Sequence, residues 1–195
     1  MSTVVAIQKE GIICLGADTL SKYGDSNESA SLIDGFSKIV RLGESYIAFV
    51  GPASFGLILE SYISSLEHLP RLHSKKEIFE FVREMHPVLK KQYFLNGSED
   101  DDDALESSQA EYLLVNQSGI YGVYSQRFVQ KYRSFYAFGS GAQYALGALF
   151  ALNDSAMGPE DAARRSLEAA AELDDGTAGP FEFRTISLAS TEGSF

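Results

Sequence analysis

The second residue of the chain, Ser2, is the first candidate for chemistry. If Met1 is removed, Ser2 carries a hydroxyl and a free α-amine on the same residue. An α-amine titrates near pH ~8, well below a lysine ammonium, so at neutral pH part of it is a base that can take the proton of the neighbouring hydroxyl. We therefore predict that Ser2 acts as nucleophile and base together. The alternative is that Met-Ser is merely a common way for a chain to start.

Asp18 is placed beside the chain start by hairpin geometry. A two-residue turn at Glu10-Gly11 between two apolar segments fixes a register in which Thr3 faces Asp18. The carboxylate can then hydrogen-bond a neighbouring hydroxyl or hold a cation. Strict pleating puts it on the face of Thr3 rather than Ser2, and a slight bend at the terminus would reconcile the two. The alternative is a strand-ending aspartate that makes a turn hydrogen bond.

Lys38 is a second charged candidate, because alternation along 36–42 places its ammonium on the same face as three apolar side chains. A buried lysine needs a partner, and Asp18 is the natural one. An ammonium held near the Ser2 oxygen would favour the alkoxide. The alternative is that Lys38 extends its ammonium to solvent.

Two glycine sites complete the set. Gly51 lies where a strand is predicted to stop and a helix to begin, just before a proline expected inside the helix start, so its N–H can point at a developing oxyanion. Gly139-Ser140-Gly141 resembles the start of a dinucleotide fingerprint, but Tyr144 stands at the third glycine position, and we reject that interpretation. Two roles remain open for Ser140: capping the next helix, or turning its hydroxyl toward the terminal amine.

Asp174 and Thr177 follow the last predicted helix. Turn formation alone would explain both residues.

The hydrophobic pattern predicts the elements that must position these residues. Strands are expected at 3–7, 12–17, 38–42, 46–50, 111–115, 119–124, 134–138 and 181–188, and helices after Gly51-Pro52, from about Ser74 with Glu77 three residues on, at 140–152 and at 159–173. The order is strands, two helices, strands, two helices, strand. It predicts an α+β sandwich of four layers (αββα), two stacked antiparallel sheets flanked by helix pairs, in one domain spanning 1–195.

Composition excludes several classes of function. The net charge of −11 repels phosphate backbones, so we expect no nucleic acid as a partner. No apolar run reaches the ~20 residues of a membrane helix, so we expect no membrane partner and a cytoplasmic location. One cysteine, Cys14, excludes an internal disulfide, and the three histidines lack zinc-site spacing; we expect no metal and no cofactor. The acidic run at 99–103 lacks the glycine of a calcium loop and is expected to be a solvated loop, its role open.

Taken in order, these motifs resemble those of proteasome β-type subunits and their HslV-like bacterial homologues, which are N-terminal nucleophile hydrolases. Ser2-Thr3-Val4-Val5-Ala6-Ile7 resembles the Thr-Thr-x-Val opening of that family, and Gly16-Ala17-Asp18-Thr19 resembles its Gly-Asp block sixteen residues after the nucleophile. The later segments that resemble family motifs are Gly35-Phe36-Ser37-Lys38-Ile39, Phe49-Val50-Gly51, Gly139-Ser140-Gly141, and Asp174 with Thr177.

The resemblance implies peptide hydrolysis through an acyl-enzyme, in a homo-oligomeric ring to which an ATPase unfoldase often feeds protein substrates. It implies Ser2 as nucleophile and base, and these supporting residues: Asp18 and Lys38 for charge, Gly51 for the oxyanion, and Ser140, Asp174 and Thr177 for orienting the amine. Serine replaces the threonine usual in this threonine-protease family and lacks its rotamer-restricting methyl, so slower turnover is expected. The alternative function is a catalytically silent ring subunit or scaffold that keeps Met1.

Overall fold

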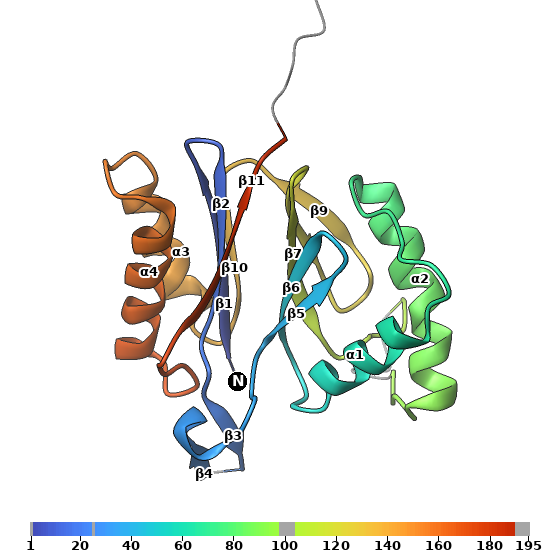
Figure 1. Cartoon of the computed structure of the whole chain (residues 1–195). Helices are drawn as coiled ribbons and strands as arrows, with labels where there is room; N and C mark the ends of the chain where they lie inside the picture. The colour runs from blue at the N-terminus through green and yellow to red at the C-terminus, as the bar shows by residue number, and fades with distance from the viewer. Residues whose placement is uncertain (1, 25, 98–103, 190–195) are drawn as a thin grey trace, which may run out of the picture.

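The computed structural model describes residues 2–24, 26–97 and 104–189. Two antiparallel sheets lie face to face, and a pair of helices covers the outer face of each sheet (Figure 1). Helices α3 (Ala142–Asn153) and α4 (Pro159–Leu173) pack on the first sheet, and helices α1 (Phe55–Ser65) and α2 (Lys75–Gln92) cover the second. The predicted α+β sandwich of four layers is therefore confirmed. The acidic run at 99–103 lies outside the described residues.

The first sheet has the strand order β10-β1-β2-β11. Its strands are β1 (Thr3–Lys9), β2 (Ile12–Ala17), β10 (Phe135–Gly139) and β11 (Glu182–Ser187). Glu10 and Gly11 form the turn between β1 and β2, and their φ angles of +51° and +77° are those of a two-residue turn that matches the twist of the strands. The turn sets a register in which Val4 pairs with Ala17, as the hairpin geometry predicts.

The second sheet has the strand order β5-β6-β7-β8-β9. Its strands are β5 (Ile39–Leu42), β6 (Ser45–Val50), β7 (Glu111–Asn116), β8 (Gly119–Val123) and β9 (Val129–Tyr132). The sequence pattern does not predict β9, nor the short β3 (Ser21–Tyr23), β4 (Ser26–Glu28) and 3-10 turn η1 (Ala30–Leu32). These segments are only three or four residues long, which is too short for a hydrophobic periodicity to show.

The α2 helix begins where the capping pattern predicts. The Ser74 hydroxyl accepts the Glu77 N–H at 3.2 Å, and the Glu77 carboxylate accepts the His73 N–H at 2.9 Å. In contrast, α1 begins only at Phe55, after a turn in which the Phe55 N–H donates to the Pro52 carbonyl at 2.9 Å. The prediction that Pro52 lies just inside this helix is therefore wrong. None of the helices in the described ranges is long and apolar enough to span a membrane.

Buried apolar side chains fill all three interfaces between the layers. Along β1, for example, Val4 and Ala6 pack against the second sheet, while Val5 and Ile7 pack against α3 and α4. Both faces of the strand are covered, which is why its sequence shows no polar alternation. The ends of β1 and β2 are thereby held inside the sandwich.

Candidate active site

The start of the chain lies at one end of the sandwich, where the inner strand β1 begins (Figure 1). Ser2 is only 6% exposed, and it lines a cavity of about 300 Å³. Its carbonyl accepts the N–H of Ser140 at 3.0 Å, which ties the chain start to the end of β10. Removal of Met1 concerns a residue outside the described ranges and stays a prediction.

Asp18 directly follows β2 and is fully buried. Its Oδ1 accepts the Thr3 N–H at 2.8 Å, and its own N–H donates to the Thr3 carbonyl at 3.1 Å, so the predicted pairing of these residues is present. Oδ2 accepts the Leu20 N–H at 3.1 Å, which is the turn bond of the alternative interpretation. One carboxylate therefore fixes both the turn after β2 and the peptide that joins Ser2 to Thr3.

Lys38 is 4% exposed, so the alternative of an ammonium extended into solvent is excluded. Its Nζ donates to Asp18 Oδ1 at 2.8 Å and to the Leu20 carbonyl at 2.7 Å. The sequence pattern placed Lys38 on the same strand face as Val40 and Leu42, and this alternation does not hold. Strand β5 begins at Ile39, so Lys38 precedes it. Val40 and Leu42 pack among the helices, whereas the ammonium reaches the opposite sheet.

Burial opposes charge on both members of this pair. It lowers the pKa of Lys38, against the attraction of Asp18, and it raises the pKa of Asp18, against Lys38 and the hydrogen bonds from Thr3 and Leu20. Each charge is stabilised chiefly by the other, because water cannot replace the missing partner. Asp18 thus holds the Lys38 ammonium in the wall of the cavity beside Ser2.

The glycines at 139 and 141 allow the chain start to approach β10 closely. Gly139 has a φ of +110°, and a Cβ there would overlap the Ser2 carbonyl oxygen. A Cβ on Gly141 would lie 2.6 Å from Thr3 Oγ1. The two glycines leave room for this backbone contact, whereas in a dinucleotide fingerprint they leave room for phosphates.

Ser140 does not cap α3, so that alternative is wrong. The helix begins at Ala142 with Gly141 as its N-cap, and the Ser140 hydroxyl donates to Asp174 Oδ2 at 2.8 Å. The same carboxylate oxygen accepts the Thr177 hydroxyl at 2.6 Å. The turn interpretation of Asp174 and Thr177 also holds, since the Thr177 N–H donates to the Asp174 carbonyl at 3.3 Å.

Thr3 is a residue of this network that sequence reasoning did not assign to the site. Its Oγ1 lies 2.5 Å from Thr177 Oγ1 and accepts the Gly141 N–H at 3.1 Å. Because the single proton of Thr177 goes to Asp174, Thr3 donates its own proton to Thr177. The hydroxyl chain from Ser140 through Asp174 therefore ends at the residue after Ser2. The sequence named Thr3 only as the hairpin partner of Asp18, a contact that its backbone N–H makes, and gave no signal for its hydroxyl contact with Thr177.

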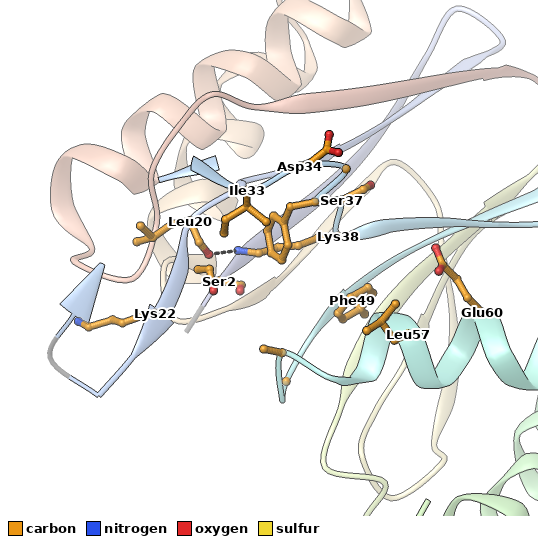
Figure 2. A pocket seen from close by; sticks show the side chains of 16 residues that line it. Ser2, Leu20, Lys22, Ile33, Asp34, Ser37, Lys38, Phe49, Leu57 and Glu60 are labelled. Atoms are coloured by element: carbon orange, nitrogen blue, oxygen red, sulfur yellow. Dashed lines mark hydrogen bonds between the residues drawn. The ribbon is translucent and has the colours of Figure 1, made fainter. Parts of the chain in front are cut away.

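Gly51 follows the last residue of β6 and lines the same cavity. Its φ is +146°, and a Cβ there would lie 2.7 Å from the Gln109 carbonyl oxygen. Since α1 starts only at Phe55, Gly51 belongs to the strand end and not to the helix start. The cavity itself passes between Ser2, Leu20 and Lys38 on one side and Phe49, Leu57 and Glu60 on the other (Figure 2).

Comparison with protein-family models gives no match, and comparison with curated proteins gives none either. Solved structures do match. Thiobacillus denitrificans BPH superposes with a TM-score of 0.92 at 40% identity, over 96% of this chain and 99% of that chain. The same protein in complex with epoxomicin gives a TM-score of 0.90 at 40% identity and the same coverage. Eukaryotic HslV from Trypanosoma brucei gives 0.62 at 18% identity, over 95% of this chain and 99% of that chain.

The layers and these matches define the N-terminal nucleophile hydrolase fold of the proteasome and HslV, which is a protease-type fold. With 40% identity over nearly the whole of both chains, the protein belongs to the same family as Thiobacillus denitrificans BPH. The likeness to HslV, at 18% identity, concerns the fold alone. The predicted proteasome/HslV-like fold is confirmed, while the assignment to one subtype stays a prediction.

Proposed function

We propose that the protein hydrolyses peptide bonds with Ser2 as an N-terminal nucleophile once Met1 has been removed. The α-amine takes the proton of Ser2 Oγ, and Oγ bonds to the carbonyl carbon of the substrate. Collapse of the tetrahedral intermediate breaks the C–N bond, the proton passes to the leaving amine, and an ester on Ser2 remains. Water, deprotonated by the same α-amine, then hydrolyses the ester.

Two groups at the cavity stabilise the charge that develops in this reaction. The Lys38 ammonium, held by Asp18, favours the alkoxide form of Ser2, and the Gly51 N–H donates to the oxyanion of the substrate. The buried Asp18–Lys38 pair, with Lys38 in the wall of the cavity beside Ser2, is the observation that carries this proposal.

Ser140, Asp174 and Thr177 position the amine by fixing the backbone around it. The Ser140 N–H holds the Ser2 carbonyl at 3.0 Å, and Thr177 holds Thr3 through a hydroxyl contact of 2.5 Å. A base must lie within hydrogen-bond reach of the proton it takes, so such anchoring contributes directly to rate.

Peptides or unfolded proteins are the proposed substrates, and a homo-oligomeric ring in the cytoplasm is the proposed assembly, with an ATPase unfoldase as a further partner. These assignments rest on the resemblance to proteasome β-type subunits and on the family relative that binds epoxomicin.

A peptide epoxyketone tests the mechanism, because the hydroxyl adds to its ketone and the α-amine opens its epoxide to close a ring. We expect a covalent adduct on Ser2 in chain whose Met1 has been removed, located by mass spectrometry of the N-terminal peptide. The Ser2→Ala variant, with the same free amine, should give none. If processed wild-type chain forms no adduct, the mechanism is excluded.

The second candidate, a catalytically silent ring subunit, is favoured by the serine in place of threonine, since a serine rotamer is less restricted. Intact mass separates the two. A chain that keeps Met1 when purified from its own host supports the silent subunit, and a chain that has lost it supports the enzyme.

A further inference from the structure

Glu182 makes contacts at the site that no sequence motif indicates. It is the first residue of β11 and pairs in register with Ala17, the residue before Asp18. Its side chain is only 16% exposed. Its Oε1 accepts the backbone N–H of Lys38 at 2.7 Å, and its Oε2 accepts the Ser37 hydroxyl at 2.7 Å.

The hydroxyl of Ser37 extends this contact to the next residue. Ser37 Oγ accepts the Ile39 N–H at 3.0 Å, and its one proton has the Ile39 carbonyl and the Glu182 carboxylate within reach. The carboxylate of Glu182 is the strongest acceptor within reach, because a charged acceptor makes the stronger hydrogen bond. One carboxylate of the first sheet therefore fixes three consecutive residues where the chain enters the second sheet.

Lys38 needs such an anchor because of its place in the chain. It precedes β5, the edge strand of the second sheet, and follows a connection whose described residues form the short elements β3, β4 and η1. Its carbonyl accepts the Phe49 N–H of β6 at 3.2 Å, while Glu182 holds its N–H. With the backbone held on both sides, the side chain extends across to Asp18 and the Leu20 carbonyl.

We propose that Glu182 is a positioning residue that clamps Ser37 and Lys38 so that the Lys38 ammonium is held at Asp18, beside Ser2. The proposal rests on the proposed function, since it concerns the same lysine. Glu182 does not line the cavity, so its effect on the reaction is exerted through Lys38.

The carboxylate also acts on the charge of Lys38. Burial lowers the pKa of Lys38, and the negative charges of Asp18 and Glu182 both raise it. Asp18 binds the ammonium from the end of β2, whereas Glu182, on β11, accepts the backbone N–H of the same lysine. Arg184 Nη2 lies 3.9 Å from Glu182 on the same strand. Loss of the Glu182 charge should therefore lower the pKa of Lys38 further.

Three variants of the processed chain separate geometry from charge. Glu182→Gln keeps an oxygen that can accept the Lys38 N–H but removes the charge. Ser37→Ala keeps the charge but removes the hydroxyl that links Glu182 to the Ile39 N–H. Glu182→Ala removes the charge together with the acceptors of the Lys38 N–H and the Ser37 hydroxyl. Glu67→Gln, at an exposed carboxylate away from the site, is the matched control. The readouts are kcat and KM on a peptide substrate, the pH profile of kcat, the rate of epoxyketone labelling and the thermal midpoint.

We expect kcat to fall about 100-fold in Glu182→Ala and about 10-fold in Glu182→Gln, because a displaced ammonium stabilises the transition state less well. KM should change little, since Glu182 itself does not line the cavity. Ser37→Ala should lower kcat roughly threefold to tenfold. The alkaline limb of the pH profile, which follows Lys38 deprotonation, should move to lower pH in Glu182→Gln and stay in place in Ser37→Ala. Glu67→Gln should match wild type.

A purely structural role would lower the thermal midpoint and leave the kcat and pH limb of the folded fraction at wild-type values, and this result would overturn the proposal. If Glu182→Ala does not fold, the two milder variants carry the same test. Failure of the proposed function looks different: wild-type chain itself would show no turnover and no adduct.

Discussion

The ion pair at the chain start and the one at the end of α2 differ in how far water reaches them. Lys38 and Asp18 are 2.8 Å apart, with side chains 5% and 0% exposed. Glu106 binds Lys90 and also lies 3.2 Å from His86 Nε2, but the side chains of Lys90 and Glu106 are 40% and 52% exposed. Both regions join groups from separate segments, but only the first holds both charged partners away from solvent.

This difference decides what each pair contributes. At the surface, water replaces a lost partner, so an ion pair adds little to stability. Inside the sandwich, removal of one partner leaves a charge that nothing else solvates. The buried pair therefore makes the region around Ser2 rigid and costly to alter, as a site that must position charge requires, whereas the surface pair is replaceable.

Removal of the lysine charge is the strongest way to test the contrast. Lys38→Met leaves Asp18 buried without its cation, and we expect the free energy of unfolding to fall by about 3–5 kcal/mol. Peptide turnover should fall about 100-fold to 1,000-fold. Urea unfolding and kcat provide the two measurements.

The double variant Lys38→Met with Asp18→Asn is the control for this prediction. It neutralises both partners, but the amide oxygen that replaces the carboxylate can accept only one of the two N–H groups, Thr3 or Leu20, that Asp18 accepts on separate oxygens. Part of the stability should therefore return, while turnover stays low. Recovery of activity in the double variant would contradict a role of the Lys38 charge in the reaction.

The packing around the chain start gives a second prediction. Gly139→Ala should lower the free energy of unfolding by about 3 kcal/mol and reduce turnover, since the new methyl group overlaps the Ser2 carbonyl at a φ that alanine rarely adopts. Gly147→Ala is the matched control, because this glycine lies in α3 with open space around it. Alanine there should stabilise the helix by about 0.5–1 kcal/mol. Equal effects of the two changes in chemical denaturation would show that the chain start is not closely packed.

The pH dependence of the unfolding free energy gives a third prediction, which concerns His86. Burial lowers its pKa, so the folded chain disfavours the proton that the unfolded chain accepts near pH 6.5. The stability contributed by neutral His86 is therefore fully present above pH 6.5 and declines as the pH falls toward the folded pKa. Glu106, whose pKa is lowered first by its hydrogen bond with Lys90, titrates at lower pH. In His86→Phe, the slope of unfolding free energy between pH 5 and 7 should flatten; an unchanged slope would assign it to other groups.

The smallest effect is expected at the surface pair. Glu106→Gln removes the partner of Lys90 where both side chains are solvated, and the urea midpoint at neutral pH should stay at the wild-type value. A loss comparable with that of Lys38→Met would mean that exposure does not separate the two pairs.

The sequence by itself determined the features that depend on neighbouring residues. The Glu10-Gly11 turn fixed the hairpin register and so brought Asp18 to the chain start. The Ser74 and Glu77 pattern fixed the start of α2. Hydrophobic periodicity and turn residues predicted the order of the helices and strands, and that order predicted the four layers. These features can be read from the sequence because local hydrogen bonds and side-chain spacing act within a few residues. The catalytic roles and the single-domain organisation of 1–195 stay predictions.

Only the tertiary structure decided the contacts that close the site. Thr3 meets Thr177 across 174 positions, and Lys38 meets Glu182 across 144. It also showed that Gly139 makes room for the Ser2 carbonyl and that the Lys38 side chain turns away from its own sheet. No local pattern encodes these contacts, since each depends on how two sheets and their helix pairs stack, and stacking is determined by the packing of the whole core.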